Sequence, residues 1–151
     1  MKQLYLIVFL LIGVILVCLG QPSKSSETYH KINQYIRMGD ANALTSHMKD
    51  MVELVMNSSA ETYSKTQVIS ILKDFFKDNQ PVEFEVVQIW KEQHITHVLG
   101  TYTSNCSQYR FYYSLKPEQR NAYPVIFHIN IEQTKKCKNK CSNPNQNASK
   151  P

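Results

Sequence analysis

The chain has 151 residues, of which 42% are hydrophobic and 19% are charged. These values are typical of one globular domain and exclude an intrinsically disordered chain. The formal net charge of +5 comes from the two ends, because five lysines follow residue 134 and one stands at position 2. Removing those six from the 17 basic residues leaves 11, against 12 acidic residues. The domain itself is therefore about neutral, and we expect no nucleic-acid partner.

The first 20 residues predict a signal peptide. A basic start precedes an almost unbroken apolar run from Leu4 to Leu19, and the small residues Cys18 and Gly20 suit cleavage before Gln21. We expect export to the periplasm or the extracellular space, with the mature chain in an oxidising compartment. Two alternatives place the chain on a membrane: a retained N-terminal anchor, for which the run is short, and lipidation of Cys18.

Three segments follow the signal peptide. Residues 21–26 predict a polar linker, residues 27–134 a single domain, and residues 135–151 a basic, cysteine-containing disordered tail. The domain opens with helical spacing of apolar residues that ends at Gly39. Asp40 can cap a second, short helix.

Two short segments precede the next helix. Val52–Met56 is apolar and predicts a short strand, and Asn57–Glu61 is polar and predicts a turn.

The strongest local signal is the stretch Tyr63–Pro81, which predicts an amphipathic helix. Ser64 as N-cap and Gln67 three residues later form a capping box, Asn79 suits the C-terminal cap, and Pro81 prevents continuation. One stripe at helical spacing carries the apolar residues Val68, Ile71, Leu72, Phe75 and Phe76. We expect this stripe to pack on the strands that follow.

Beyond Pro81 the apolar pattern changes to a period of two residues. Four segments predict strands: Phe84–Lys91, His94–Thr103, Gln108–Lys116 and Pro124–Glu132. Strict alternation groups Phe84 and Val86 with Trp90 in the first strand, and Ile126 with His128 in the last. Short polar turns predict an antiparallel meander, so the fold class is α+β: N-terminal helices packed on one face of a curved, four- to five-stranded antiparallel sheet.

Five stretches carry a family resemblance. They read GDANALTSHMKDMVEL, YSKTQVISILKDFFKDNQPVEFEV, HVLGTYTS, YRFYYSLK and IFHINIE. Together they resemble domain-of-unknown-function family 4783, a small exported bacterial family, across roughly residues 32–132. The resemblance implies a nuclear-transport-factor-2-like or cystatin-like fold. It implies no activity, because the family has no established one.

The sequence contains few candidates for catalysis or metal binding. His94 and His97 stand three apart on a predicted strand, so they point to opposite faces and cannot readily share a metal ion. A nucleophile elbow, a phosphate loop and a zinc-ligand spacing are all missing from the sequence. We therefore predict no catalytic residue, no cofactor and no metal.

The face of the sheet away from the helices offers a different kind of site. Its candidate residues are Tyr102, Arg110, Tyr112, His128 and Asn130. Tyrosine and arginine are enriched at protein interfaces, so this face could contact a partner or a second copy of the chain; the alternative is an ordinary solvated face. We predict a non-catalytic binding or interaction module of the cell envelope. The alternative is a small-molecule enzyme with a pocket in the same fold.

Three cysteines remain once the leader is removed, so at most one intramolecular disulfide can form. We expect the local bridge between Cys137 and Cys141, which closes a small loop and needs no folded domain. Two alternatives stay open. One is a long-range bridge from Cys106 to the tail, which requires Cα atoms within about 7 Å. The other is free thiols.

Overall fold

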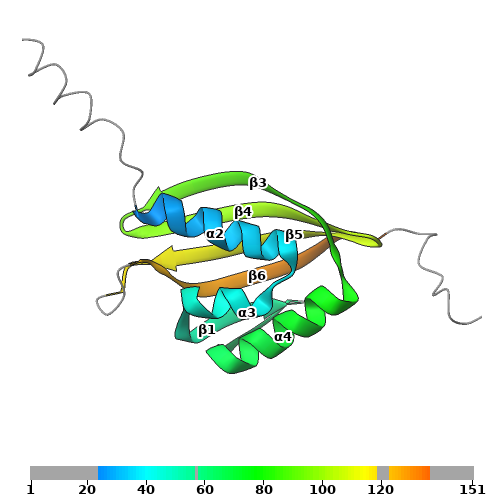
Figure 1. The fold of residues 1–151 in the computed structure, drawn as a ribbon, viewed down its shortest axis with the longest axis horizontal. Helices are drawn as coiled ribbons and strands as arrows, with labels where there is room; N and C mark the ends of the chain where they lie inside the picture. The colour runs from blue at the N-terminus through cyan, green and yellow to red at the C-terminus, as the bar shows by residue number, and fades with distance from the viewer. Residues whose placement is uncertain (1–23, 57, 119–122, 137–151) are drawn as a thin grey trace, which may run out of the picture.

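The computed structural model describes residues 24–56, 58–118 and 123–136 and shows an α+β domain (Figure 1). In chain order the elements are α2 (Lys24–Met38), α3 (Ala41–Leu44), the 3-10 helix η1 (Thr45–His47), β1 (Met48–Met56), β2 (Ser59–Ser64), α4 (Lys65–Asp78), β3 (Pro81–Glu92), β4 (Ile95–Ser104), β5 (Ser107–Lys116) and β6 (Val125–Lys136). The expected signal peptide and most of the expected tail lie outside the described residues. Within them, no helix is long and apolar enough to cross a membrane.

The two N-terminal helices meet at a tight corner. Gly39 adopts a φ of +66°, a conformation that costs glycine little because it has no Cβ. This turn lets the Asp40 N–H donate to the carbonyl of Tyr35, and the Asp40 carboxylate accepts from the Ala43 N–H at 3.0 Å. The predicted cap of α3 is therefore confirmed. α2 begins at Lys24, three residues earlier than expected, so the linker ends sooner than the polar composition indicated.

The capping box of α4 is confirmed. The Gln67 N–H donates to the Ser64 hydroxyl at 3.4 Å, and the Ser64 N–H donates back to the Gln67 side chain at 3.0 Å. The helix ends at Asp78, and the Asn79 N–H closes it on the Phe75 carbonyl. Four residues of the predicted stripe are buried: Val68, Leu72, Phe75 and Phe76. Ile71 is only half-buried and lines a cavity described below.

The sheet has six strands in the order β2-β1-β6-β5-β4-β3, which corrects the expected four or five. It is also mixed and not purely antiparallel, because β1 pairs parallel to β6 while every other neighbouring pair is antiparallel. The additional strand is β2, a polar, mostly exposed edge strand where the sequence predicted a turn. It lacks the apolar alternation that identifies a half-buried strand.

Two β-bulges change which residues face the core. Val87 is an extra residue in β3, so Trp90 pairs with His97 and lies on the face opposite to Phe84. Phe127 is an extra residue in β6, so Ile126 pairs with Leu115 and is buried in the core. Strict alternation therefore assigned Trp90 and Ile126 to the wrong faces, since one inserted residue reverses every side chain beyond it.

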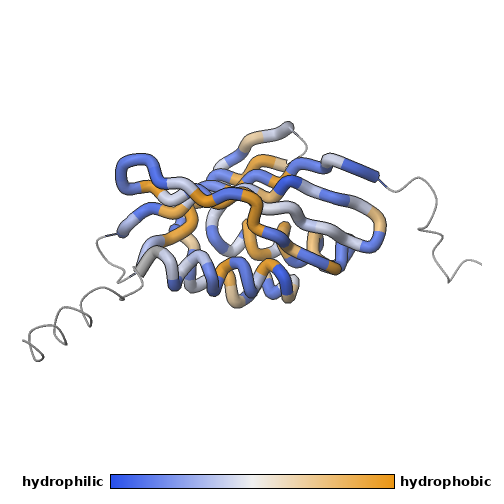
Figure 2. Tube along the Cα trace, turned by 90° about the horizontal axis from the view of Figure 1, so that it is seen from above, coloured by the Kyte–Doolittle hydropathy of each residue, from blue (hydrophilic) through white to orange (hydrophobic). Residues whose placement is uncertain are grey.

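All described helices lie on one side of the sheet. Figure 1 shows α2, α3 and α4 in front of the strands, and the perpendicular view in Figure 2 shows α2 along one side of the sheet. The core between the two layers is filled by apolar and aromatic side chains. A polar link crosses the layers beneath α2, where the buried Tyr113 hydroxyl donates to Asn33 at 2.7 Å.

Candidate functional site

The sheet face away from the helices, here called the outer face, presents alternate residues of neighbouring strands. It includes Glu53, Trp90, His97, Leu99, Thr101, Arg110, Tyr112, Ser114, His128, Asn130 and Glu132. Four of the five predicted interface residues lie there. Tyr112 of β5 stands opposite Leu99 of β4 and Asn130 of β6, and Arg110 stands opposite Thr101.

Tyr102 does not belong to the outer face, which corrects the prediction. Its side chain is 0% exposed, it packs against Phe75 and Phe76 of α4, and its hydroxyl donates to the backbone carbonyl of Asn79. Burial raises the pKa of this hydroxyl, and the neighbouring Tyr109 adds to the effect. Tyr102 lies four residues after Val98 in β4, so both side chains face the core.

Three aromatic rings stand side by side on the outer face. Trp90 stacks on His97 with ring centroids 5.0 Å apart, and the His97 and Tyr112 rings are 6.0 Å apart and nearly parallel. His128 contacts the Tyr112 ring edge-on at 5.5 Å. We call Trp90, His97, Tyr112 and His128 the ring row. Trp90 and His97 were not predicted as site residues, and Trp90 reaches this face only through the bulge at Val87.

Hydrogen bonds fix His97 within the ring row. Its Nδ1 lies 2.7 Å from the Tyr112 hydroxyl and 3.0 Å from the Ser114 hydroxyl, and Ser114 donates to Tyr112. Its Nε2 is shielded from solvent and has no hydrogen-bond partner among the described residues; the Glu92 carboxylate lies 4.0 Å away. The contact between Ser114 and His97 resembles that of a nucleophile and its base. Ser114 is only 2% exposed, however, so a substrate could not reach its hydroxyl.

A hydrogen bond and an ion pair lie beside the rings of the ring row. His128 Nδ1 lies 2.8 Å from the Glu53 carboxylate, and Arg110 lies 3.0 Å from the Glu132 carboxylate. Arg110 and Glu132 are both more than half exposed, so their pairing contributes little to stability. Charged groups of this kind are available to a partner that approaches the outer face.

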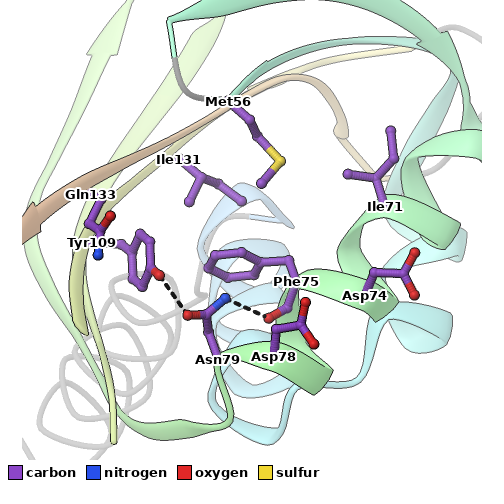
Figure 3. A pocket seen from close by; sticks show the side chains of 9 residues that line it. All are labelled: Met56, Ile71, Asp74, Phe75, Asp78, Asn79, Tyr109, Ile131 and Gln133. Atoms are coloured by element: carbon purple, nitrogen blue, oxygen red, sulfur yellow. Dashed lines mark hydrogen bonds between the residues drawn. The ribbon is translucent and has the colours of Figure 1, made fainter. Parts of the chain in front are cut away.

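A cavity of about 340 Å³ opens on the helix side of the sheet, beside the C-terminal end of α4 (Figure 3). We call it the α4 pocket. It is lined by Met56, Ile71, Asp74, Phe75, Asp78, Asn79, Tyr109, Ile131 and Gln133. None of these was predicted as a site residue, because α4, β1, β5 and β6 meet there only in the folded chain.

Asn79 organises the floor of the α4 pocket. Its side-chain amide donates to the Phe75 carbonyl at 3.1 Å, and its side-chain oxygen accepts from the Tyr109 hydroxyl at 2.6 Å. Figure 3 shows both bonds beneath the Phe75 ring. The residue predicted only as a helix cap thus also joins α4 to β5.

Cys106, in the turn between β4 and β5, is disulfide-bonded. Its partner lies outside the described residues, as do Cys137 and Cys141, for which the local bridge was expected. Of the pairings considered from the sequence, only the long-range one uses Cys106. The bonded state therefore favours that alternative, and the identity of the partner stays a prediction.

Comparison with known proteins agrees with this architecture. A family model described as "Domain of unknown function (DUF4783)" matches residues 29–132. No curated protein matches the chain in sequence.

Solved structures show the same fold at low sequence identity. A DUF4783 family protein from Bacteroides uniformis is 19% identical, with a TM-score of 0.65 over 71% of this chain and 97% of that one. One from Bacteroides ovatus is 23% identical, with a TM-score of 0.66 over 70% and 94% of the two chains. An NTF-2-like protein of unknown function from Burkholderia xenovorans is 15% identical, with a TM-score of 0.57 over 74% and 83%.

Proposed function

The chain belongs to the DUF4783 family, and from that premise we propose that it is a non-catalytic binding module whose outer face associates with a second copy of itself. The family supplies a nuclear-transport-factor-2-like fold and no activity, so the function has to be inferred from this chain's own surfaces. The observation that carries the proposal is the ring row, which stands on the one broad face of the sheet that no described helix covers.

The composition of the outer face supports a protein partner. Aromatic residues and arginine are enriched at protein interfaces, because they bury a large area and keep a polar group at one end. The outer face carries three residues of these types: Tyr112, Arg110 and Trp90, of which Trp90 is 36% exposed. Val87, the bulge residue of β3, is 63% exposed and lies beside Leu99 and Thr101 of the outer face.

A second copy is the simplest partner for such a face. In a two-fold symmetric dimer each residue meets the same surface of the other chain, so a face that carries both signs of charge can pair with itself. The outer face has this property, since Arg110 and Glu132 lie side by side near its centre strands.

The α4 pocket gives less support to an enzyme. Acid–base catalysis in a pocket relies on an ionisable group removed from solvent, because burial adjusts its pKa to the reaction. The two carboxylates that line this pocket, Asp74 and Asp78, are both exposed. The Ser114–His97 contact is closed to substrate, as described above.

Mutation of the ring row tests the proposed interface. We expect Tyr112→Glu to leave the fold intact and to convert a dimer to a monomer, because it would bury an unpaired charge at the contact. Sedimentation velocity over a range of concentrations measures the change. Ser70→Glu adds the same charge on the exposed side of α4, across the sheet from the outer face, and should leave the dimer unchanged. A wild-type chain that sediments as a monomer at all accessible concentrations would remove the hypothesis.

We also propose that the chain is exported to the cell envelope. The apolar leader supports this, and the bonded Cys106 is in keeping with an oxidising compartment. Ser107 pairs with Lys136, the last described residue of β6, and Cys137 is the first tail cysteine in the sequence, so a bridge from Cys106 to Cys137 needs the shortest reach. We therefore expect this pairing.

Mass spectrometry of protein purified from its own cells tests both export and the disulfide. We expect an intact mass that begins near Gln21 and a non-reduced peptide that joins Cys106 to Cys137. A mass that includes residues 1–20 would contradict cleavage, and acyl chains on Cys18 would indicate lipidation instead. A peptide joining Cys137 to Cys141 would restore the local bridge.

A further inference from the structure

The α4 pocket has no role in the proposed interface, because it opens on the opposite side of the sheet. Its inner wall is apolar: Phe75 is 6% and Ile131 3% exposed, and Met56 and Ile71 are half-buried beside them. About 340 Å³ lies at the lower end of the volumes of small-molecule sites, which run from about 300 to 1,000 Å³. The cavity is therefore large enough for the apolar body of a small ligand.

The polar groups of the pocket mainly offer acceptors. Tyr109 donates its hydroxyl proton to Asn79, and the Asn79 amide donates to the Phe75 carbonyl. The Gln133 amide donates to the Ser107 hydroxyl at 2.8 Å. The Tyr109 proton and one N–H of each amide are directed at protein oxygens, whereas the lone pairs of Tyr109 and the side-chain oxygen of Gln133 face no donor in these bonds. The pocket can therefore accept hydrogen bonds from a ligand.

The charge of the pocket has one sign. Asp74 and Asp78 lie one helical turn apart on the pocket side of α4 (Figure 3). Neither carboxylate has a hydrogen bond or an ion pair with any residue that the structure describes. The lysines of the same helix segment, Lys73 and Lys77, lie on its other flank, where they line a separate hollow together with Arg37. The two carboxylates are therefore available to a cation.

We propose that the α4 pocket binds a small organic cation in which an ammonium group is carried on an apolar body. The apolar body lies against Phe75, Met56 and Ile131. The ammonium group lies at the rim, where Asp74 and Asp78 balance its charge. Neither part suffices alone, because the rim is solvent-exposed and the apolar wall is small. A molecule that carries both the ammonium group and the apolar body should therefore bind more tightly than one that carries only one of them.

Isothermal titration calorimetry with the mature chain tests this proposal. The probes are hexylammonium and two molecules of nearly the same shape, neutral hexanol and anionic hexanoate. We expect hexylammonium to bind at least tenfold more tightly than hexanol, and hexanoate not to bind. Raising the salt from 50 to 500 mM should weaken hexylammonium binding several-fold, because the carboxylates are exposed. Equal binding of hexylammonium and hexanol, or no binding of either, would overturn the proposal.

Matched variants locate the site. The double substitution Asp74→Asn and Asp78→Asn keeps both shapes and removes both charges, and it should weaken hexylammonium binding at least tenfold. Glu85→Gln removes an exposed carboxylate from β3, the edge strand that takes no part in the pocket, and should change nothing. Unchanged binding in the double variant would refute the site. Tyr112→Glu should also bind normally, so failure of the interface proposal leaves this test intact.

The basic tail is the competing occupant. A synthetic peptide of residues 138–151, which carries three lysines, is added to the complex with hexylammonium. We expect no displacement at equal concentration, because the peptide lacks an apolar body beside its charges. Displacement at lower concentration than hexylammonium itself would overturn the small-molecule assignment in favour of the chain's own tail.

Discussion

Replacing Phe76 with alanine is expected to lower the free energy of unfolding by about 3–5 kcal/mol, the range found when a buried phenylalanine is truncated. Phe76 is 4% exposed, and its ring lies 5.6 Å from that of Phe75 and 6.0 Å from that of Tyr102. Truncation would leave a cavity where α4 meets the sheet. The surrounding rings are tied to one another and to Asn79, so they have little freedom to fill it.

Denaturant unfolding of the purified chain, followed by circular dichroism, measures this loss. Lys77→Ala is the matched control, because it changes the next residue of the same helix on its exposed side and should stay within about 0.5 kcal/mol of wild type. A transition midpoint that Phe76→Ala leaves unmoved would refute the packing of α4 on the sheet.

Local chemistry allowed α4 to be predicted from the sequence. Ser64, Gln67, Asn79 and Pro81 specify the two ends of the helix by short-range hydrogen bonds and steric constraints, and the apolar stripe specifies the buried side. The same applies to the corner at Gly39. None of these features depends on residues far away in the chain, and all of them were confirmed except the full burial of Ile71.

The parts that were missed depend on contacts between distant segments. β2 is polar, and its strand conformation depends on pairing with the edge of β1. β1 in turn pairs with β6, which begins about 70 residues after β1 ends. The bulges at Val87 and Phe127 are set by how neighbouring strands align, which periodicity within one strand cannot reveal.

The candidate sites also divide into features that are local in sequence and features that depend on contacts between distant segments. Alternation within β5 was enough to place Arg110 and Tyr112 on the outer face. The ring row needed the β3 bulge to bring Trp90 there, and the α4 pocket needed four elements to meet. Sequence patterns thus identified part of the outer face. The complete ring row and the α4 pocket could be recognised only once the strands and α4 were aligned in three dimensions.

Replacing Gly100 with alanine is expected to lower the free energy of unfolding by about 2 kcal/mol or more, within the range for overpacking a core. A Cβ at this position would lie 2.4 Å from two atoms of the Phe84 ring and 3.0 Å from the carbonyl oxygen of Glu85. The Phe84 ring is 2% exposed and packs edge-on against Phe111 at 5.9 Å, so it cannot simply turn away. Glycine is needed here because a neighbouring strand's ring occupies the space of a side chain.

A double-mutant cycle separates this steric conflict from a general effect of mutating β4. Phe84→Leu removes the ring atoms that would clash, so it should destabilise the wild-type chain but partly rescue the Gly100→Ala variant. The two substitutions together should therefore cost less than the sum of their separate effects, by at least about 1 kcal/mol. Thr101→Ala, on the outer face of the same strand, is the control and should change stability little. Full stability of Gly100→Ala, or strict additivity with Phe84→Leu, would show that the close approach of Phe84 does not constrain this position.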